Sequence, residues 1–123
     1  MTWAGADLPE LPRWSRGNIL LTGDAAHATL PYLAQGAAMA LEDACVLSAK
    51  LGDRSDIPSA FAEFSELRFS RASAIQKKSR QLGRIYHAGG VLRRARNAAL
   101  IAMPLRRFTT QVAWIYDWKP GGR

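Results

Sequence analysis

The spacing of apolar and polar residues predicts one strand near the start of the chain. Residues 19–22 are uncharged and mostly apolar, and turn residues flank them, with Gly17-Asn18 before them and Gly23 after them. A continuous apolar run of this length between turns is typical of a strand that is buried on both faces. We therefore expect a short buried strand over residues 18–23.

Helical spacing dominates the rest of the chain. Residues 33–52 are rich in Ala and Leu and end at Gly52, a residue that suits the C-terminus of a helix. The longest helix is expected over residues 55–87, with Ser55 or Asp56 as its N-cap. Two shorter helices are expected to follow, over residues 91–103 and residues 105–116.

These elements predict a mainly α chain in which one short buried strand is followed by about four helices. An irregular lead-in covers residues 1–17, and residues 18–52 hold the strand and the first helix. A C-terminal helical region covers residues 53–118, and residues 119–123 form a tail. Because a lone strand has no partner for its backbone N–H and C=O groups, we expect it to pair with part of a sheet outside this chain.

The composition argues against several classes of protein. The single cysteine, Cys45, excludes a disulfide within the chain and favours a reducing, cytoplasmic setting. The only histidines are His27 and His87, and no spacing resembles a zinc site, so we expect no bound metal. The first residues lack the pattern of a signal peptide, and no apolar stretch is long enough to span a bilayer. We therefore expect no association with a membrane.

The charge is distributed unevenly. The chain of 123 residues has a formal net charge of +7, with −3 on residues 1–53 and +10 on residues 54–123. This excess fits a small basic helical module that binds nucleic acid or another anionic partner. It fits equally a chain whose arginines are neutralised by acids on another chain or on a part of the protein outside this sequence. The basic residues are spread over several helices, which argues against nucleic acid as the partner.

A candidate binding site follows the expected strand. Asp24 lies at the strand's end, where open α/β sheets bind ligands, and an ionised carboxylate can accept hydrogen bonds from the hydroxyls of a ribose or ribityl chain. Farther along, Gly36 and small residues begin a helix, whose first N–H groups lack partners and favour negative charge. Two simpler interpretations remain open, because Asp24 could cap a turn and the small residues could serve close packing.

The order of these residues is more specific than any one of them. The motif consists of Gly23, Asp24, Ala25, Ala26, His27 and Pro31, then Gln35 to Met39, then Ala40 to Ala44 with the sequence ALEDA. In this order the chain resembles the C-terminal part of the FAD-dependent aromatic hydroxylases of the p-hydroxybenzoate hydroxylase fold. Salicylate hydroxylase-like and 6-hydroxynicotinate monooxygenase-like members are the most similar. The resemblance extends from about residue 12 to the aromatic residues of segment 114–118.

The resemblance implies a flavin site. In such enzymes the Asp of the Gly-Asp pair hydrogen-bonds the ribityl chain of FAD, and the Pro lies against the edge of the isoalloxazine ring. Backbone N–H groups of the following helix face N1 and the C2 carbonyl of the flavin. No catalytic residue is implied, because His27 is a motif residue of the family and not its established base. The implied FAD-binding residues are Gly23, Asp24, Pro31, Gln35, Gly36, Ala37, Ala38 and Met39.

The resemblance also implies a reaction and a missing part. Such enzymes hydroxylate a small aromatic or heteroaromatic substrate with FAD, NADH or NADPH, and O₂, in an α/β, Rossmann-like FAD-binding fold. Their G-x-G-x-x-G fingerprint for the ADP pyrophosphate is absent from this sequence. The chain is therefore expected to be incomplete without an N-terminal nucleotide-binding half or a partner chain that carries it. Arg68, Arg71 and Lys78, on or beside the apolar stripe of the longest helix, would pair with acids in that missing part.

Overall fold

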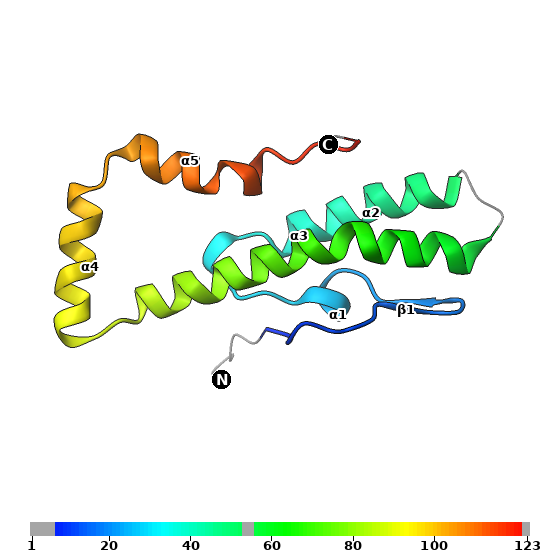
Figure 1. The fold of residues 1–123 in the computed structure, drawn as a ribbon, viewed down its shortest axis with the longest axis horizontal. Helices are drawn as coiled ribbons and strands as arrows, with labels where there is room; N and C mark the ends of the chain where they lie inside the picture. Colours follow the sequence, from blue (N-terminus) through cyan, green and yellow to red (C-terminus); the bar gives the residue numbers. More distant parts are fainter. Residues whose placement is uncertain (1–6, 53–55, 122–123) are drawn as a thin grey trace. The chain divides into compact units, whose positions relative to one another are not determined.

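The structure, a computed structural model, describes residues 7–52 and 56–121. The chain forms two compact units, Met1–Arg80 and Gln81–Arg123. Among the described residues, two short strands are followed by a series of helices (Figure 1). The expectation of a mainly α chain is therefore confirmed.

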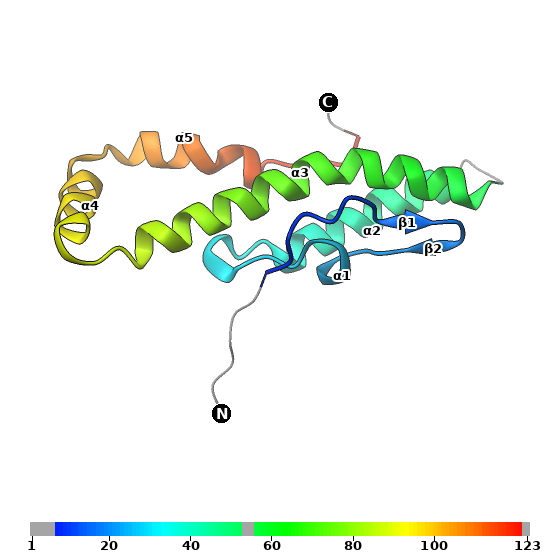
Figure 2. The ribbon, with the colours of Figure 1, turned by 60° about the horizontal axis from the view of Figure 1, so that its bottom comes forward.

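The first strands of the first unit form a small antiparallel hairpin (Figure 2). Strand β1 covers Ser15–Arg16, and strand β2 covers Ile19–Leu20. Gly17 has a φ of 56° in the turn between them, a conformation that favours glycine. The paired residues are Ser15 with Leu20 and Arg16 with Ile19.

The expected strand over residues 18–23 is wrong in its length, its pairing and its burial. The strand contains two residues, it pairs with β1 of the same chain, and the side chain of Ile19 is 69% exposed. The apolar run predicted cover on both faces, but within the described residues the sheet has only these two strands. A two-stranded sheet cannot enclose every apolar side chain that it carries.

Two short turns of helix connect the hairpin to the first long helix. Helix α1 covers Asp24–His27, and the 3₁₀ helix η1 covers Pro31–Leu33. Pro31 stands at the start of η1, where its missing N–H is not needed. Helix α2 then covers Gly36–Gly52, which confirms the helix expected in this part of the chain.

The longest helix, α3, covers Ile57–Tyr86 and confirms the long helix expected over residues 55–87. Ser55, one of the two expected N-caps, lies outside the described residues. The other, Asp56, directly precedes the helix, and its backbone carbonyl accepts the N–H of Ala60 at 3.1 Å. In Figures 1 and 2, α3 lies side by side with α2.

Apolar side chains from the lead-in, from α1 to α2 and from α3 form the core of the first unit. Trp14 is 4% exposed, and its ring centroid lies 6.5 Å from that of Phe64 and 5.9 Å from that of Phe69. Burial of a side chain the size of Phe64 stabilises the fold by about 1.5–3 kcal/mol. The other buried apolar residues of this unit are Ala26, Leu33, Met39, Ala60, Ala72 and Ile75.

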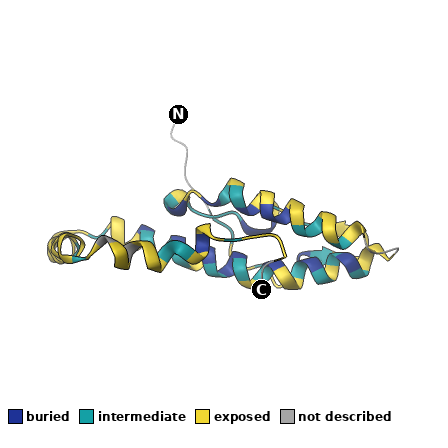
Figure 3. Ribbon diagram, turned by 90° about the horizontal axis from the view of Figure 1, so that it is seen from above, coloured by how far each residue is buried: buried dark blue, intermediate teal, exposed yellow. Residues whose placement is uncertain are grey.

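The second unit contains the helices α4, Gly90–Ala102, and α5, Leu105–Tyr116, which confirm the two short helices expected there. None of the residues of α4 is buried (Figure 3). The side chains of Val91 and Ile101 are 81% and 87% exposed. Among the helices that the structure describes, none is long and apolar enough to cross a membrane.

Candidate functional site

The turn that carries the Gly-Asp pair depends on glycine. Gly23 has a φ of 56° and a ψ of −138°, a backbone conformation that residues with a Cβ rarely adopt. Its carbonyl accepts the N–H groups of Ala26 at 3.0 Å and His27 at 2.9 Å, which begins α1. A Cβ at Gly23 would lie 3.6 Å from the Cβ of Ala40, so the turn packs directly against α2.

The structure brings Asp24 to the start of α2. A Cβ added at Gly36 would lie 3.9 Å from Oδ1 of Asp24, and Asp24 is exposed. Within the described residues, the N–H groups of Gly36, Ala37 and Ala38 make no hydrogen bond, as is usual in the first turn of a helix. A carboxylate and a set of unbonded N–H groups therefore lie next to each other, as the sequence led us to expect.

The remaining expected residues fall into two groups. Pro31 is exposed and begins η1, so its ring is accessible. Gln35 and Met39 are buried, with 4% and 0% of their surface exposed, so their side chains face the interior of the unit. The N–H of Met39 donates to the carbonyl of Gln35 at 2.8 Å and is already used within the helix. Of the N–H groups expected to face a flavin, that of Met39 is therefore the least available.

A buried carboxylate on α2 connects three parts of the first unit. Oδ2 of Asp43 accepts the N–H of Gly23 at 2.9 Å and lies 2.7 Å from Nε2 of His27. Oδ1 of Asp43 accepts the Nε–H of Arg68 on α3 at 2.7 Å. Asp43, His27 and Arg68 are each at most 2% exposed, so these bonds are shielded from water. Asp43 therefore links the Gly-Asp turn and α1 to both long helices.

A second carboxylate extends this network. Glu42 is 5% exposed, and its Oε2 lies 2.8 Å from Nη1 of Arg68. The guanidinium of Arg71 donates to both oxygens of Glu42, at 2.7 Å from Nε and 2.6 Å from Nη2. Such paired contacts between a planar guanidinium and a carboxylate are among the stronger hydrogen bonds in proteins. Two acids of α2 thus neutralise two arginines of α3.

This network corrects one expectation from the sequence. Arg68 and Arg71 do not depend on acids outside this chain, because Glu42 and Asp43 of the ALEDA segment are their partners. The signal was present, since two adjacent acids on an otherwise apolar helix need partners when they are buried. Lys78, the third residue of that expectation, is partly exposed, and its pairing stays a prediction.

His27 is enclosed and has one free ring nitrogen. Its side chain is 0% exposed, and its ring centroid lies 5.2 Å from that of Trp14. Because an ionised carboxylate can only accept, Nε2 carries the proton that is donated to Asp43. Nδ1 has no hydrogen-bond partner among the described residues. His27 is thus built into the interior and holds the turn, a contact that the sequence alone did not reveal.

The surroundings of Asp43 keep its carboxyl group ionised. Burial alone raises the pKa of a carboxyl group, because it removes the charged form from water. Here the hydrogen bonds from His27, from the N–H of Gly23 and from Arg68 outweigh burial and hold the pKa of Asp43 below its ordinary value. The carboxylate of Asp43 is therefore ionised at neutral pH where it faces the guanidinium of Arg68.

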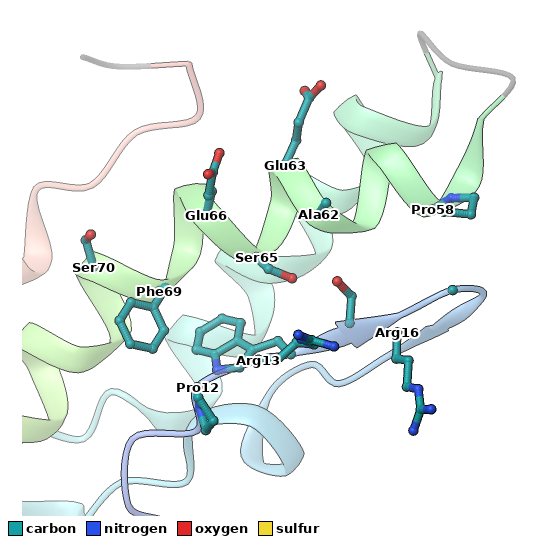
Figure 4. A pocket seen from close by; sticks show the side chains of 13 residues that line it. Pro12, Arg13, Arg16, Pro58, Ala62, Glu63, Ser65, Glu66, Phe69 and Ser70 are labelled. Atoms are coloured by element: carbon teal, nitrogen blue, oxygen red, sulfur yellow. The ribbon is translucent and has the colours of Figure 1, made fainter.

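A groove lies in another part of the first unit. It has a volume of about 760 Å³ and runs between the hairpin and α3 (Figure 4). Phe69 and Ser65 point from α3 toward the hairpin, and Arg13 lies on the opposite side. None of the residues expected to bind flavin lines this groove, so it is a separate feature from the surface at Asp24 and Gly36.

Known proteins share the sequence around Asp24 and Gly36. Residues 10–56 match the family profile of the FAD binding domain. Across nearly the whole chain, the 3-hydroxybenzoate 6-hydroxylase of Polaromonas naphthalenivorans (strain CJ2) is 42% identical over 120 residues, covering 97% of this chain and 30% of that protein. Nearly the whole chain is therefore similar to part of a hydroxybenzoate hydroxylase.

Two further relatives show the same relation. The 3-hydroxybenzoate 6-hydroxylase of Klebsiella oxytoca is 40% identical over 118 residues, which are 95% of this chain and 30% of that protein. A salicylate hydroxylase of Pseudomonas putida is 40% identical over 88 residues, 68% of this chain and 20% of that protein. The chain therefore spans less than a third of the length of these hydroxylases, and the match to the FAD binding domain contains the Gly-Asp turn and the start of α2.

Proposed function

We propose that this chain supplies part of the flavin site of an FAD-dependent monooxygenase. The enzyme would hydroxylate a small aromatic or heteroaromatic substrate with NADH or NADPH and O₂. One observation carries the proposal, namely that the exposed carboxylate of Asp24 lies beside Gly36, where α2 begins with unbonded N–H groups. The hydroxybenzoate and salicylate hydroxylases among its relatives support the reaction and the class of substrate.

The residues present fit a flavin. The carboxylate of Asp24 can accept hydrogen bonds from the hydroxyls of a ribityl chain. The N–H groups of Gly36, Ala37 and Ala38 point out of the start of a 17-residue helix, where the helix dipole favours the negative charge of a reduced flavin at N1 and the C2 carbonyl. Gly36 has no Cβ, so a flat ring can approach the backbone. When bound, FAD would supply the redox chemistry, and these residues would orient it.

The proposed site includes the whole set inferred from the sequence, with different contributions. Asp24 and Pro31 would contact the cofactor with their side chains, since both are exposed. Gln35 and Met39, whose side chains are buried, would contribute only through the backbone around them. Gly23 would act by shaping the turn.

The rest of the enzyme would come from outside this sequence. The chain spans about 30% of the length of its hydroxybenzoate hydroxylase relatives and contains no G-x-G-x-x-G segment for the pyrophosphate. We infer that an N-terminal nucleotide-binding half, in one chain or in a partner chain, completes an α/β FAD-binding fold. A cytoplasmic location stays a prediction.

The first test is the binding of FAD by the purified chain. Bound flavin would be detected by its visible absorption and by the change in its fluorescence. We expect Asp24→Ala to weaken binding about tenfold, because charge-assisted hydrogen bonds to the ribityl hydroxyls are lost. The matched control is Asp117→Ala, which removes another exposed carboxylate at the end of α5. Equal affinity of the two variants would contradict the proposed site.

The alternative of a basic module for nucleic acid has become weaker. Two of the arginines on α3, Arg68 and Arg71, are engaged in ion pairs with Glu42 and Asp43, so they are not available to phosphates. Retention on DNA that falls steeply with salt would revive the alternative, because phosphate contacts release counterions. We expect only weak retention at physiological salt.

A further inference from the structure

The position of Asp24 depends on the residue before it. Asp24 follows Gly23, whose backbone conformation aims the chain from the hairpin into α1. The N–H of Gly23 has one hydrogen-bond partner in the structure, Oδ2 of Asp43, at 2.9 Å. The side chain of Asp43 on α2 therefore fixes the backbone just before Asp24, and with it the direction in which the carboxylate of Asp24 points.

The other end of the four-residue helix is fixed by the same atom. Asp24 begins α1 and His27 ends it, and Nε2 of His27 donates to Oδ2 of Asp43 at 2.7 Å. One carboxylate oxygen thus holds both the residue before Asp24 and the residue three positions after it. A short helix has little stability of its own, so its orientation depends on contacts of this kind.

Asp43 is itself held in place from α3. Arg68 donates from Nε to Oδ1 of Asp43 at 2.7 Å, while its Nη1 contacts Glu42. With Glu42 and Arg71, the group joins two carboxyl groups of α2 to two guanidinium groups of α3. All the hydrogen bonds of Asp43 are used to position neighbours, and none of its oxygens is exposed to a ligand.

We propose that Asp43 is a positioning residue for the flavin site, which holds the turn at Gly23 and the helix α1 so that the carboxylate of Asp24 faces the start of α2 at Gly36. The distance of 3.9 Å between Oδ1 of Asp24 and the Cβ position of Gly36 is the result of this arrangement. Asp43 and Gly36 belong to the same helix. The positions of the Asp24 carboxylate and of the N–H groups at Gly36 are therefore both set by α2. The part of the inference that concerns FAD rests on the proposed function, whereas the part that concerns the turn does not.

The chain offers a matched control at the neighbouring position. Glu42 is buried like Asp43 and pairs with Arg68, but within the described residues the hydrogen bonds to Gly23 and His27 are made by Asp43 and not by Glu42. Glu42→Gln and Asp43→Asn each remove one buried negative charge from the same network. Both variants are expected to lose stability, and only Asp43→Asn removes the charged acceptor of the turn.

The deciding experiment is hydrogen exchange at the Gly23 amide, measured by NMR on the full chain and on both variants. We expect the Gly23 amide to exchange at least about tenfold faster in Asp43→Asn than in Glu42→Gln, when each rate is compared with core amides of α3 in the same variant. This internal comparison separates a local effect on the turn from a general loss of stability. Equal relative rates in the two variants would overturn the inference.

FAD affinity is measured on the same three proteins. We expect Asp43→Asn to weaken binding about tenfold beyond Glu42→Gln, since an altered second layer of contacts commonly costs at least that much. Faster Gly23 exchange with unchanged FAD affinity would overturn the claim that the turn positions the cofactor. If the unaltered chain binds no FAD at all, the proposed function fails for this chain alone, and the exchange rates still decide whether Asp43 holds the turn.

A second measurement covers the case in which Asp43→Asn does not fold. In the unaltered chain, a bond of 2.9 Å to a carboxylate predicts a scalar coupling across the hydrogen bond, between the amide nitrogen of Gly23 and the carboxyl carbon of Asp43. The ring nitrogens of His27 should also report a proton on Nε2, the atom that faces Asp43. Absence of the coupling, or the opposite tautomer, would overturn the inference.

Discussion

The two units of the chain keep their arginines in different ways. In the first unit, Arg68 is 2% exposed and is held between two carboxylates of another helix. In the second unit, Arg93 and Arg94 lie on α4, a helix with no buried residue. The difference teaches that the basic residues behind the net charge of +7 have different structural roles. Some of the positive charge stabilises the fold from inside, and some of it, as on α4, faces solvent.

The largest effect is expected from breaking the buried network. Arg68→Ala leaves the carboxylates of Asp43 and Glu42 in the interior without their shared partner, which should reduce the free energy of unfolding by about 3–5 kcal/mol. Arg93→Ala on α4 removes the same type of side chain from an exposed position and should change it by less than about 0.5 kcal/mol. Urea denaturation followed by circular dichroism measures both. Similar losses would contradict the distinction between the two units.

The next largest effect is expected from a fall in pH, which should destabilise the first unit through Asp43. The pKa of Asp43 lies below its value in the unfolded chain, so Asp43 stabilises the fold above the unfolded pKa, and this contribution is lost as the pH falls through the folded pKa. Residue-resolved hydrogen exchange, followed as the pH falls below the ordinary aspartate pKa of about 4, should therefore show the first unit opening as acid is added. In Asp43→Asn this part of the pH dependence should be absent. An unchanged acid profile in that variant would refute the assignment.

A smaller effect is expected at the end of α3. Nη1 of Arg96 donates to the carbonyls of Ile85 and Tyr86 at 3.1 and 2.7 Å, so a positive charge lies where the helix dipole is negative. Arg96→Ala should therefore loosen the last turn of α3 by about 0.5–1 kcal/mol. Exchange of the amides of residues 83–87 measures this loss. Arg94→Ala, on the same helix, serves as the control and should leave those amides unchanged.

The smallest effect is expected on the surface of α4. Ile101 is 87% exposed, so Ile101→Ser removes few contacts and should change the free energy of unfolding by less than about 0.5 kcal/mol. Thermal denaturation of the chain measures it, with Ile75→Ser in the buried part of α3 as the contrasting variant. A large loss at Ile101 would mean that this side chain is covered in solution.

The helices and the Gly-Asp turn could be predicted from the sequence because both depend on local rules. The Ala- and Leu-rich segment that ends at Gly52 and the helical spacing of the later segments follow from backbone and side-chain preferences of single segments. The juxtaposition of Asp24 and Gly36 also followed, because the order of the motif is specific.

Two features required the three-dimensional structure. The hairpin was missed because an apolar run indicates a strand but does not name its partner, and β1 consists of only Ser15 and Arg16. The contacts of Asp43 with Gly23, His27 and Arg68 were missed because they join residues that are 16 to 25 positions apart in the sequence. Glu42 and Arg71 are 29 positions apart. Spacing along the chain carries no direct signal for such pairs.

The buried network also makes its members dependent on one another during evolution. A single loss at Glu42, Asp43, Arg68 or Arg71 removes at least one ion-pair partner from a charge in the interior, whereas removal of a whole pair can cost little. The effects of substitutions at these four positions are therefore strongly non-additive. In descendants of this chain, we expect the four residues to be retained together or replaced together, and a lone replacement at one of them to be followed by a second across the interface between α2 and α3.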